Sequence, residues 1–270
     1  IWANYAMAEI DFGKFIKFIP GLRMEQTYVD YSGFQSVLGI SQDDIEEDEG
    51  REAEIFDLFN EVYAQNTYLN VLPQIHLKIK PNDWFDVRLA YTNTISRPSY
   101  SELAPKLRAI PAKIGYEIRK GDTNLNPALS RNLDFIMTFY KKKIGLISLG
   151  LFQKDIQGFI YRRNSRIIEG TAVDVNNFGL PPEVTSKVKR GVIDYVLNNP
   201  NDARLRGLEF DFQSNLSFLP IDGFVLNLNF TLMQSQLGYN FVYQLDKQIG
   251  INPSTFQPIF EFNDVDTVLY

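Results

Sequence analysis

The strongest constraint on the fold is a two-residue period in hydrophobicity that returns along the chain. Between Phe85 and Ile95, apolar residues alternate with polar ones such as Asp86 and Arg88. Successive side chains of a β-strand point to opposite faces, so this pattern predicts a strand with one apolar and one polar face. The alternation recurs in four further segments, at Gln74 to Ile79, Asn132 to Phe139, Leu208 to Gln213 and Leu226 to Leu232. The sequence therefore predicts an all-β fold.

The predicted strands are long for a soluble protein. Less regular strands are expected at Ile1 to Phe12, Phe15 to Asp30 and Ile144 to Phe159, which gives about eight strands in all. Most of them exceed the average of about 5 to 6 residues for strands of globular proteins. They reach the roughly 9 to 11 residues that a tilted strand needs to cross a bilayer. Strand length therefore favours a membrane protein.

The connections between these strands alternate between short and long. Short turns are predicted at residues 13–14, 81–84, 141–143 and 219–223, and long loops at about 31–66, 97–128, 160–203 and 237–260. Tight periplasmic turns and long extracellular loops alternate in this way in outer-membrane barrels. We therefore expect one domain over residues 1–270, a transmembrane antiparallel up-and-down β-barrel.

Composition excludes several other classes of protein. No run of 18 apolar residues exists, so helical membrane spans are excluded. The absence of cysteine removes disulfides, thiolate catalysis and cysteine metal sites. A net charge of -6 argues against nucleic acid as a partner. Because no phosphate-binding loop is present, we expect no cofactor.

Two neighbouring motifs resemble a known family. The chain reads SRPSYSELAP from Ser96 to Pro105 and GDTNLNPALSRNLDF from Gly121 to Phe135. In this order they resemble the barrel of TonB-dependent outer-membrane receptors. Further matching stretches are FIPGLRMEQT, GLFQKDIQGFIY and ARLRGLEFDFQSNLSFLP. Proline cannot donate to a strand ladder and belongs at the barrel rim, while Gly121 suits a turn with unusual backbone angles.

The resemblance implies a specific function and location. Such receptors have an N-terminal plug and a barrel of about 22 strands, so this chain is expected to be a C-terminal part of the barrel, without the plug. It implies an importer, not an enzyme, in the outer membrane of a Gram-negative bacterium. The ligand would be a siderophore, haem, cobalamin, an oligosaccharide or a peptide. Implied partners are the TonB complex acting through the plug, membrane lipid and lipopolysaccharide, and a surface lipoprotein.

Two other functions remain open from the sequence. A passive porin or structural barrel would share the strand pattern. An outer-membrane hydrolase would need His76, the only histidine, beside a serine and an acid. A structural histidine facing the lumen is the expected reading, because no partner motif accompanies it.

Ligand contacts are expected in the loop stretches Arg97 to Tyr116 and Tyr161 to Asn177, because loops carry the binding residues of such folds. The candidates are Arg97, Tyr100, Tyr116, Tyr161, Arg162 and Arg163. The arginines beside Tyr161 could attract an anionic substrate or lipopolysaccharide phosphate. The alternative is a plain charged rim.

One predicted loop is strongly acidic. Ser41 to Glu54 carries eight carboxylates. Oxygen-rich loops can bind calcium, but the spacing is not that of the twelve-residue calcium loop, so a solvated loop is the alternative. The following residues, Ile55 to Tyr68, could form a short amphipathic helix.

Overall fold

The computed structural model describes residues 1–37, 58–112, 115–141, 145–168, 190–215, 224–251 and 258–269. The acidic stretch at 41–54 and the predicted short turns at 141–143 and 219–223 lie wholly or mostly outside these residues. The described helix, α1, spans Tyr100–Leu103. No helix in the described ranges is long and apolar enough to cross a membrane.

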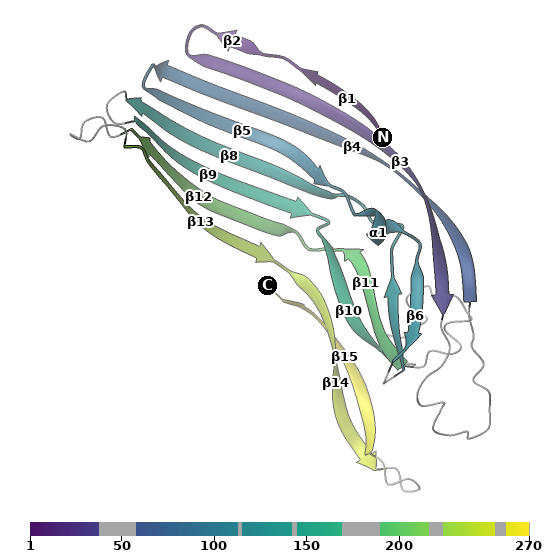
Figure 1. Ribbon diagram of the computed structural model, residues 1–270. Helices are drawn as coiled ribbons and strands as arrows, with labels where there is room; N and C mark the ends of the chain where they lie inside the picture. Colours follow the sequence, from purple (N-terminus) through teal and green to yellow (C-terminus); the bar gives the residue numbers. More distant parts are fainter. Residues whose placement is uncertain are drawn as a thin grey trace.

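A curled antiparallel sheet forms the body of the molecule (Figure 1). Its strands are β1 (Trp2–Met7), β2 (Ile10–Phe12), β3 (Ile16–Val37), β4 (Leu58–Asn82), β5 (Phe85–Ser96), β8 (Ala128–Lys141), β9 (Gly145–Gln157), β12 (Ala203–Ser214) and β13 (Leu226–Leu237). β1 and β2 both pair with β3, and the others follow in the order β3-β4-β5-β8-β9-β12-β13. This up-and-down arrangement confirms the predicted fold class. We call this part of the sheet the wall.

The segments predicted as long loops contain further strands. These are β6 (Leu107–Pro111), β7 (Tyr116–Lys120), β10 (Ile160–Ile168), β11 (Arg190–Asn198), β14 (Tyr239–Ile251) and β15 (Pro258–Leu269). β10, β11, β7 and β6 form a four-stranded extension that joins the wall where β6 pairs in parallel with β3. Pairing between these strands provides hydrogen-bond partners for backbone N–H and C=O groups that in an open loop would bond to water.

The helix suggested for residues 55–68 is wrong from Leu58 onward. β4 begins at Leu58, and each residue from there to Ile79 pairs with β3. A continuous ladder of backbone hydrogen bonds with β3 replaces the bonds within a helix. The two strands therefore form one long hairpin that extends well beyond the other wall strands (Figure 1).

The two faces of the wall differ in chemistry. Residues that pair across strands point to the same face. One complete row is apolar on seven strands, and it consists of Phe18, Leu77, Leu89, Phe135, Leu151, Leu208 and Leu232. The adjacent row on the other face includes His76, Ala90 and Asp134. The alternation predicted from the sequence therefore gives the continuous sheet one apolar face and one polar face.

Burial identifies the polar face as the inner one. Polar side chains on that face are shielded, with Glu25 6%, Asp86 2% and Thr138 5% exposed. Apolar side chains on the opposite face are open, with Leu133 53% and Phe230 58% exposed. Side chains converge on the concave side of a curved sheet and diverge on its convex side. The apolar face is therefore the convex, lipid-facing surface expected of an outer-membrane barrel.

The apolar band on this outer face climbs across the sheet toward the long-loop, extracellular end. In β12 the row of Leu208 is its last apolar row, because Arg206 follows on the same face. In β4 the same row holds Leu77, and large aliphatic residues continue on that face at Ile75, Val71 and Leu69. Leu69 lies about 26 Å along the strand from the row of Leu77, over about 19 Å of lateral spacing between β12 and β4. The wall strands are therefore strongly tilted relative to the apolar band, as membrane-spanning strands are.

Candidate ligand site at the extracellular end

The segment between β5 and β8 packs on the inner face of the β3–β4 hairpin. Leu103 of α1 and Leu125 share a small buried core with Tyr31 of β3 and Val196 of β11. From β4, the side-chain amide of Asn66 donates a hydrogen bond of 3.0 Å to the carbonyl oxygen of Thr123. The connection therefore lies inside the curl of the wall, over the mouth of the barrel.

The short helix α1 begins this segment because of its capping residues. Ser99 is the N-cap, and both its backbone N–H and its hydroxyl donate to the Glu102 carboxylate at 2.8 Å. The Glu102 carboxylate thus satisfies the backbone N–H of the N-cap residue, as in one half of a capping box. Pro98 precedes the cap, which ends the pairing of β5. The sequence SRPSYSEL thus folds as a strand end followed by one capped turn.

The two motifs that carry the family resemblance touch each other. The backbone N–H of Gly121 donates to the carbonyl oxygen of Lys106 at 3.0 Å, and that of Asp122 to Glu102 at 2.8 Å. A Cβ on Gly121 would lie 2.2 Å from the carbonyl oxygen of Ala104. The positive-φ glycines of the described residues are Gly13, Gly115, Gly145 and Gly158, so unusual angles at Gly121 were wrongly expected. Close backbone approach is what requires glycine here.

A second contact fixes the end of the segment. The Asn198 side chain on β11 accepts from the Asn126 backbone N–H and donates to the Asn126 carbonyl oxygen, both at 2.8 Å. The same amide donates to the carbonyl oxygen of Gly158 at 2.8 Å. One side chain therefore joins the segment before β8 to the turn before β10.

Between this segment and the wall lies a pocket of about 450 Å³. Its lining combines hydroxyl, charged and apolar side chains from β5, α1, β8, β9 and β10. They are Thr94, Ile95, Ser96, Arg97, Glu102, Ala128, Ser130, Ile156, Phe159 and Ile160. A concave site with a few polar groups among apolar ones is typical of small-molecule binding.

The charges beside the pocket balance one another. Both Arg97 and Arg23 donate to the Glu25 carboxylate, which is buried on the inner face of β3. Glu102 lines the pocket together with Arg97. Farther out, the hydroxyl of Tyr31 on β3 is also buried. That hydroxyl has no hydrogen-bond partner in the described part of the chain.

The six predicted contact residues fall into two groups. Arg97 lines the pocket, and Tyr100 is 81% exposed on α1. Tyr116, Tyr161, Arg162 and Arg163 belong to the four-stranded extension, as parts of β7 and β10. Tyr116 is buried, and Arg162 forms an ion pair of 3.0 Å with Asp194. Whether any of the six touches ligand stays a prediction.

Most pocket residues were not singled out from the sequence. Thr94, Ser96 and Ser130 are ordinary members of the polar phase of β5 and β8, so nothing in their local sequence marks them. Glu25 is likewise an ordinary polar-phase residue of β3 and follows Leu22, Arg23 and Met24 in alternation. Only the fold of the connecting segment brings these residues together.

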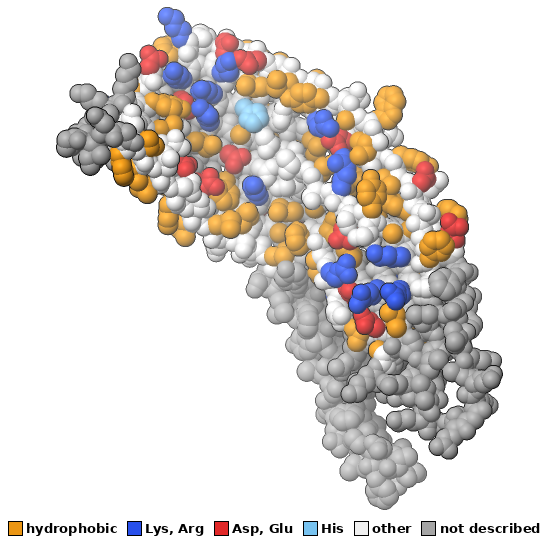
Figure 2. Space-filling model, in the orientation of Figure 1, with side chains coloured by type: hydrophobic (Ala, Val, Ile, Leu, Met, Phe, Trp, Pro, Cys, Tyr) orange, Lys and Arg blue, Asp and Glu red, His pale blue; other side chains and the backbone are white. Residues whose placement is uncertain are grey.

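His76 lies on the inner face of β4, among lysine and arginine side chains (Figure 2). Its cross-strand partners are Ile19 and Ala90, which supply neither a nucleophile nor a carboxylate. Within the described residues, no group of three or more His, Cys, Asp or Glu could hold a metal ion. The acidic stretch proposed for calcium lies outside those residues.

Comparison with known proteins identifies the family. The family described as TonB dependent receptor-like, beta-barrel matches residues 1–263. A double mutant of the Serratia marcescens hemophore receptor HasR, solved with its hemophore HasA and heme, has a TM-score of 0.54 and 14% identity over 88% of this chain. The ferric-catecholate import receptor Fiu from E. coli K12 has a TM-score of 0.51 and 12% identity over 89%. No curated protein sequence matches.

The chain spans 34% of the HasR chain and 28% of the Fiu chain, so it corresponds to a part of each. At these identities the two structures support the fold alone. The family match covers nearly the whole sequence, and the wall has the tilt and the apolar outer face of a membrane barrel. This chain therefore belongs to the TonB dependent receptor-like β-barrel family, and it forms barrel wall in the outer membrane of a Gram-negative bacterium.

Proposed function

We propose that this chain is part of a TonB-dependent importer that takes a scarce nutrient from the cell surface into the periplasm. The observation that carries the proposal is the pocket at the mouth, which Arg97 and Glu102 line between the wall and the segment packed on its inner face. A ligand bound there lies at the entrance to the lumen. Transport would be driven by the TonB complex acting on a plug.

The lining indicates which ligands suit the pocket. Arg97 is neutralised by Glu25, and the second charge in the pocket is the Glu102 carboxylate. The rest of the lining combines the hydroxyl side chains of Thr94, Ser96 and Ser130 with apolar residues of β9 and β10. The site therefore favours a ligand with apolar and hydroxyl groups over a polyanion. Among the candidate ligands, a compact amphipathic chelate or an oligosaccharide fits this lining best.

Uptake by cells that express the full-length protein tests the proposal. A panel of ferric siderophores, haem, cobalamin, oligosaccharides and peptides is offered to matched strains with and without TonB. We expect one ligand class to be taken up only when TonB is present. Equal uptake in both strains would instead support a passive porin, which liposome-swelling measurements would then confirm.

A pair of variants tests the pocket itself. Ser130→Trp fills the pocket, while Ser148→Trp places the same side chain on the inner face of β9, away from it. We expect Ser130→Trp to weaken ligand binding at least about tenfold, as an obstructed site loses most of its contacts. Ser148→Trp should bind normally. Equal binding by both variants would place the ligand elsewhere.

His76→Ala addresses the hydrolase alternative. Because the residues opposite His76 provide no catalytic partner, we expect uptake and any esterase activity of purified protein to be unchanged by this variant. A loss of hydrolysis in His76→Ala would revive the enzyme hypothesis.

A further inference from the structure

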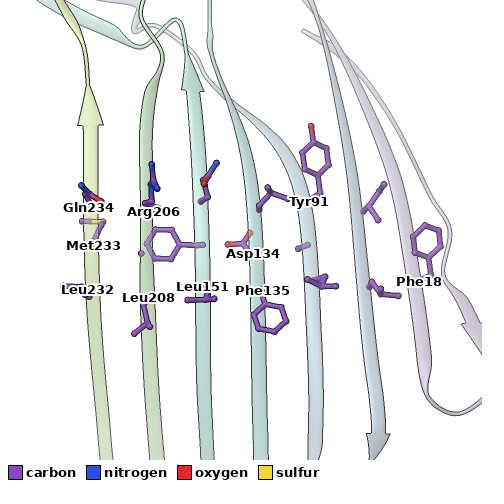
Figure 3. A pocket seen from close by; sticks show the side chains of 18 residues that line it. Phe18, Tyr91, Asp134, Phe135, Leu151, Arg206, Leu208, Leu232, Met233 and Gln234 are labelled. Atoms are coloured by element: carbon purple, nitrogen blue, oxygen red, sulfur yellow. The ribbon is translucent and has the colours of Figure 1, made fainter. Parts of the chain in front are cut away.

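An apolar groove crosses the outer face of the wall from β3 to β13 (Figure 3). Leu232, Leu208, Leu151 and Phe135 lie side by side on four neighbouring strands and form one margin of the groove. The groove is on the lipid-facing side, so it is separate from the pocket at the mouth. Its surface suits hydrocarbon chains.

The other margin of the groove changes character along its length. On β4 and β8 it is apolar, with Ile75 and Leu133, whereas on β9, β12 and β13 it consists of Gln153, Arg206 and Gln234. In Figure 3, Arg206 and Gln234 lie one step beyond the row of Leu208 and Leu232. Charged and amide groups thus border hydrocarbon-facing residues directly.

The next row outward contains two more arginines. Arg131 of β8 is paired with Asp155 of β9, and Asp155 with Arg204 of β12. Two of these groups neutralise each other, because Arg204 donates to the Asp155 carboxylate at 2.6 Å. Gln153 also donates to that carboxylate, at 2.8 Å. We call Arg131, Arg204 and Arg206, with Asp155, the outer arginine patch.

The outer arginine patch carries a net positive charge. Its three arginines lie near two carboxylates, since Asp202 also acts on Arg204 and Arg206 acts on Asp155. Among the described residues, no salt bridge joins Arg131 or Arg206 to an acid. Both side chains are exposed. Arginine binds phosphate through paired N–H groups and loses little hydration energy in doing so.

Because the wall strands are tilted, the residues of the outer arginine patch on different strands lie at a similar depth relative to the membrane. The apolar band ends at Leu208 on β12 and at Leu133 on β8, where Arg206 and Arg131 are the next outward-facing residues. These positions lie at the extracellular edge of the band. That edge is where the phosphate groups of outer-leaflet lipid lie, with their acyl chains beside the band.

We propose that the outer arginine patch binds the phosphate groups of lipopolysaccharide, with its acyl chains in the adjacent groove. Arg131 and Arg206 provide the uncompensated charge, and Arg204 is held in place by Asp155. The interaction is independent of the transported ligand, since it lies on the opposite face of the wall. It attaches a phosphorylated glycolipid to the β8–β13 side of the barrel.

The test uses detergent-purified full-length protein and purified lipopolysaccharide. The variant Arg131→Gln/Arg206→Gln removes the free charges, and Arg108→Gln/Arg119→Gln removes two arginines of the four-stranded extension as a charge-matched control. We expect the first variant to bind lipopolysaccharide about tenfold more weakly than wild type and the control to bind normally. Arg131→Lys/Arg206→Lys should recover part of the affinity, because the charge remains.

Two further probes separate lipid phosphate from other ligands. Enzymatically dephosphorylated lipopolysaccharide should bind wild type and the glutamine variant equally weakly, and inorganic phosphate alone should not compete at millimolar concentration. Equal binding of intact lipopolysaccharide by wild type and the variant would overturn the proposal, as would full competition by inorganic phosphate. Heat-modifiable migration on gels verifies folding, and Arg206→Gln alone serves if the double variant does not fold.

Discussion

Gly121 lies so close to Ala104 that a Cβ on Gly121 would come within 2.2 Å of the Ala104 carbonyl oxygen. The contact joins the end of α1 to the stretch that leads into β8. Because both partners are backbone, neither can rotate away from an added methyl group. The position of the segment over the mouth of the barrel therefore depends on the absence of a side chain at residue 121.

Gly121→Ala should displace this segment. We expect a loss of about 1 to 3 kcal/mol in stability, from overpacking, and a cleavage site in residues 97–128 that opens to added protease. Gly150→Ala is the control, because its nearest neighbour would lie 3.6 Å away at the Cβ of Glu209. Limited proteolysis of folded protein measures the effect. Equal protection from protease in both variants would show that the close approach of Gly121 to Ala104 does not determine the position of the segment.

Asn198→Asp tests the second attachment of the same segment. The substitution keeps the acceptor for Asn126 but replaces a donor by a charged oxygen that faces two carbonyl groups. We expect a loss of about 1 to 3 kcal/mol, because hydrogen bonds are replaced by repulsion. Asn124→Asp adds the same charge at an exposed position of the segment and should have little effect. Thermal unfolding compares the two variants. Similar melting temperatures for both would contradict the predicted destabilisation of Asn198→Asp.

Glu25→Gln tests the charge pairing beside the pocket. The neutral side chain leaves Arg23 and Arg97 facing each other without the shared carboxylate. We expect lower stability and weaker ligand binding, since Arg97 loses the group that orients it. Glu117→Gln breaks an exposed pair with Arg119 and should change neither property. Chemical unfolding and ligand titration give the two readouts, and unchanged binding in Glu25→Gln would remove Arg97 from the site.

Phe210→Arg and Glu209→Arg distinguish the two faces of β12. Phe210 belongs to the apolar outer band and its neighbour Glu209 to the inner face. A cation on the lipid side costs about 2 to 4 kcal/mol at the bilayer midplane and about 0 to 1 near an interface. Phe210 lies one outward-facing position below the extracellular edge of the band, so we expect Phe210→Arg to cost about 1 to 2 kcal/mol. The same change on the inner face should be tolerated. Folding into lipid vesicles, followed by urea titration, measures both, and the reverse order of stability would invert the assigned faces.

The wall could be predicted from the sequence because its signal is local. In β5, the alternation from Phe85 to Ile95 needs no distant residue to be recognised, and the observed strand covers Phe85–Ser96. The climb of the apolar band could not be predicted, since it depends on register. A shift of one residue between strands would place every side chain on the other face.

The extension could not be predicted for a different reason. β6 and β7 have five residues each, too few for a period to stand out. β6 also pairs in parallel with β3, more than 70 residues earlier in the chain at Gln35 and Leu107. The motif SRPSYSELAP indicated the family, but the roles of Gly121 and Asn198 emerged only from the contacts between distant segments.

The length of the β3–β4 hairpin also affects what the cell presents to its surroundings. From Leu69, the outermost large aliphatic residue of the β4 band, to Leu58, the strand continues for 11 residues, which at a tilt of about 45° rises roughly 25 Å. This part of the hairpin projects beyond the lipid-facing band on the extracellular side. A large particle that approaches the cell surface would therefore meet the β3–β4 hairpin before it reached the pocket at the mouth.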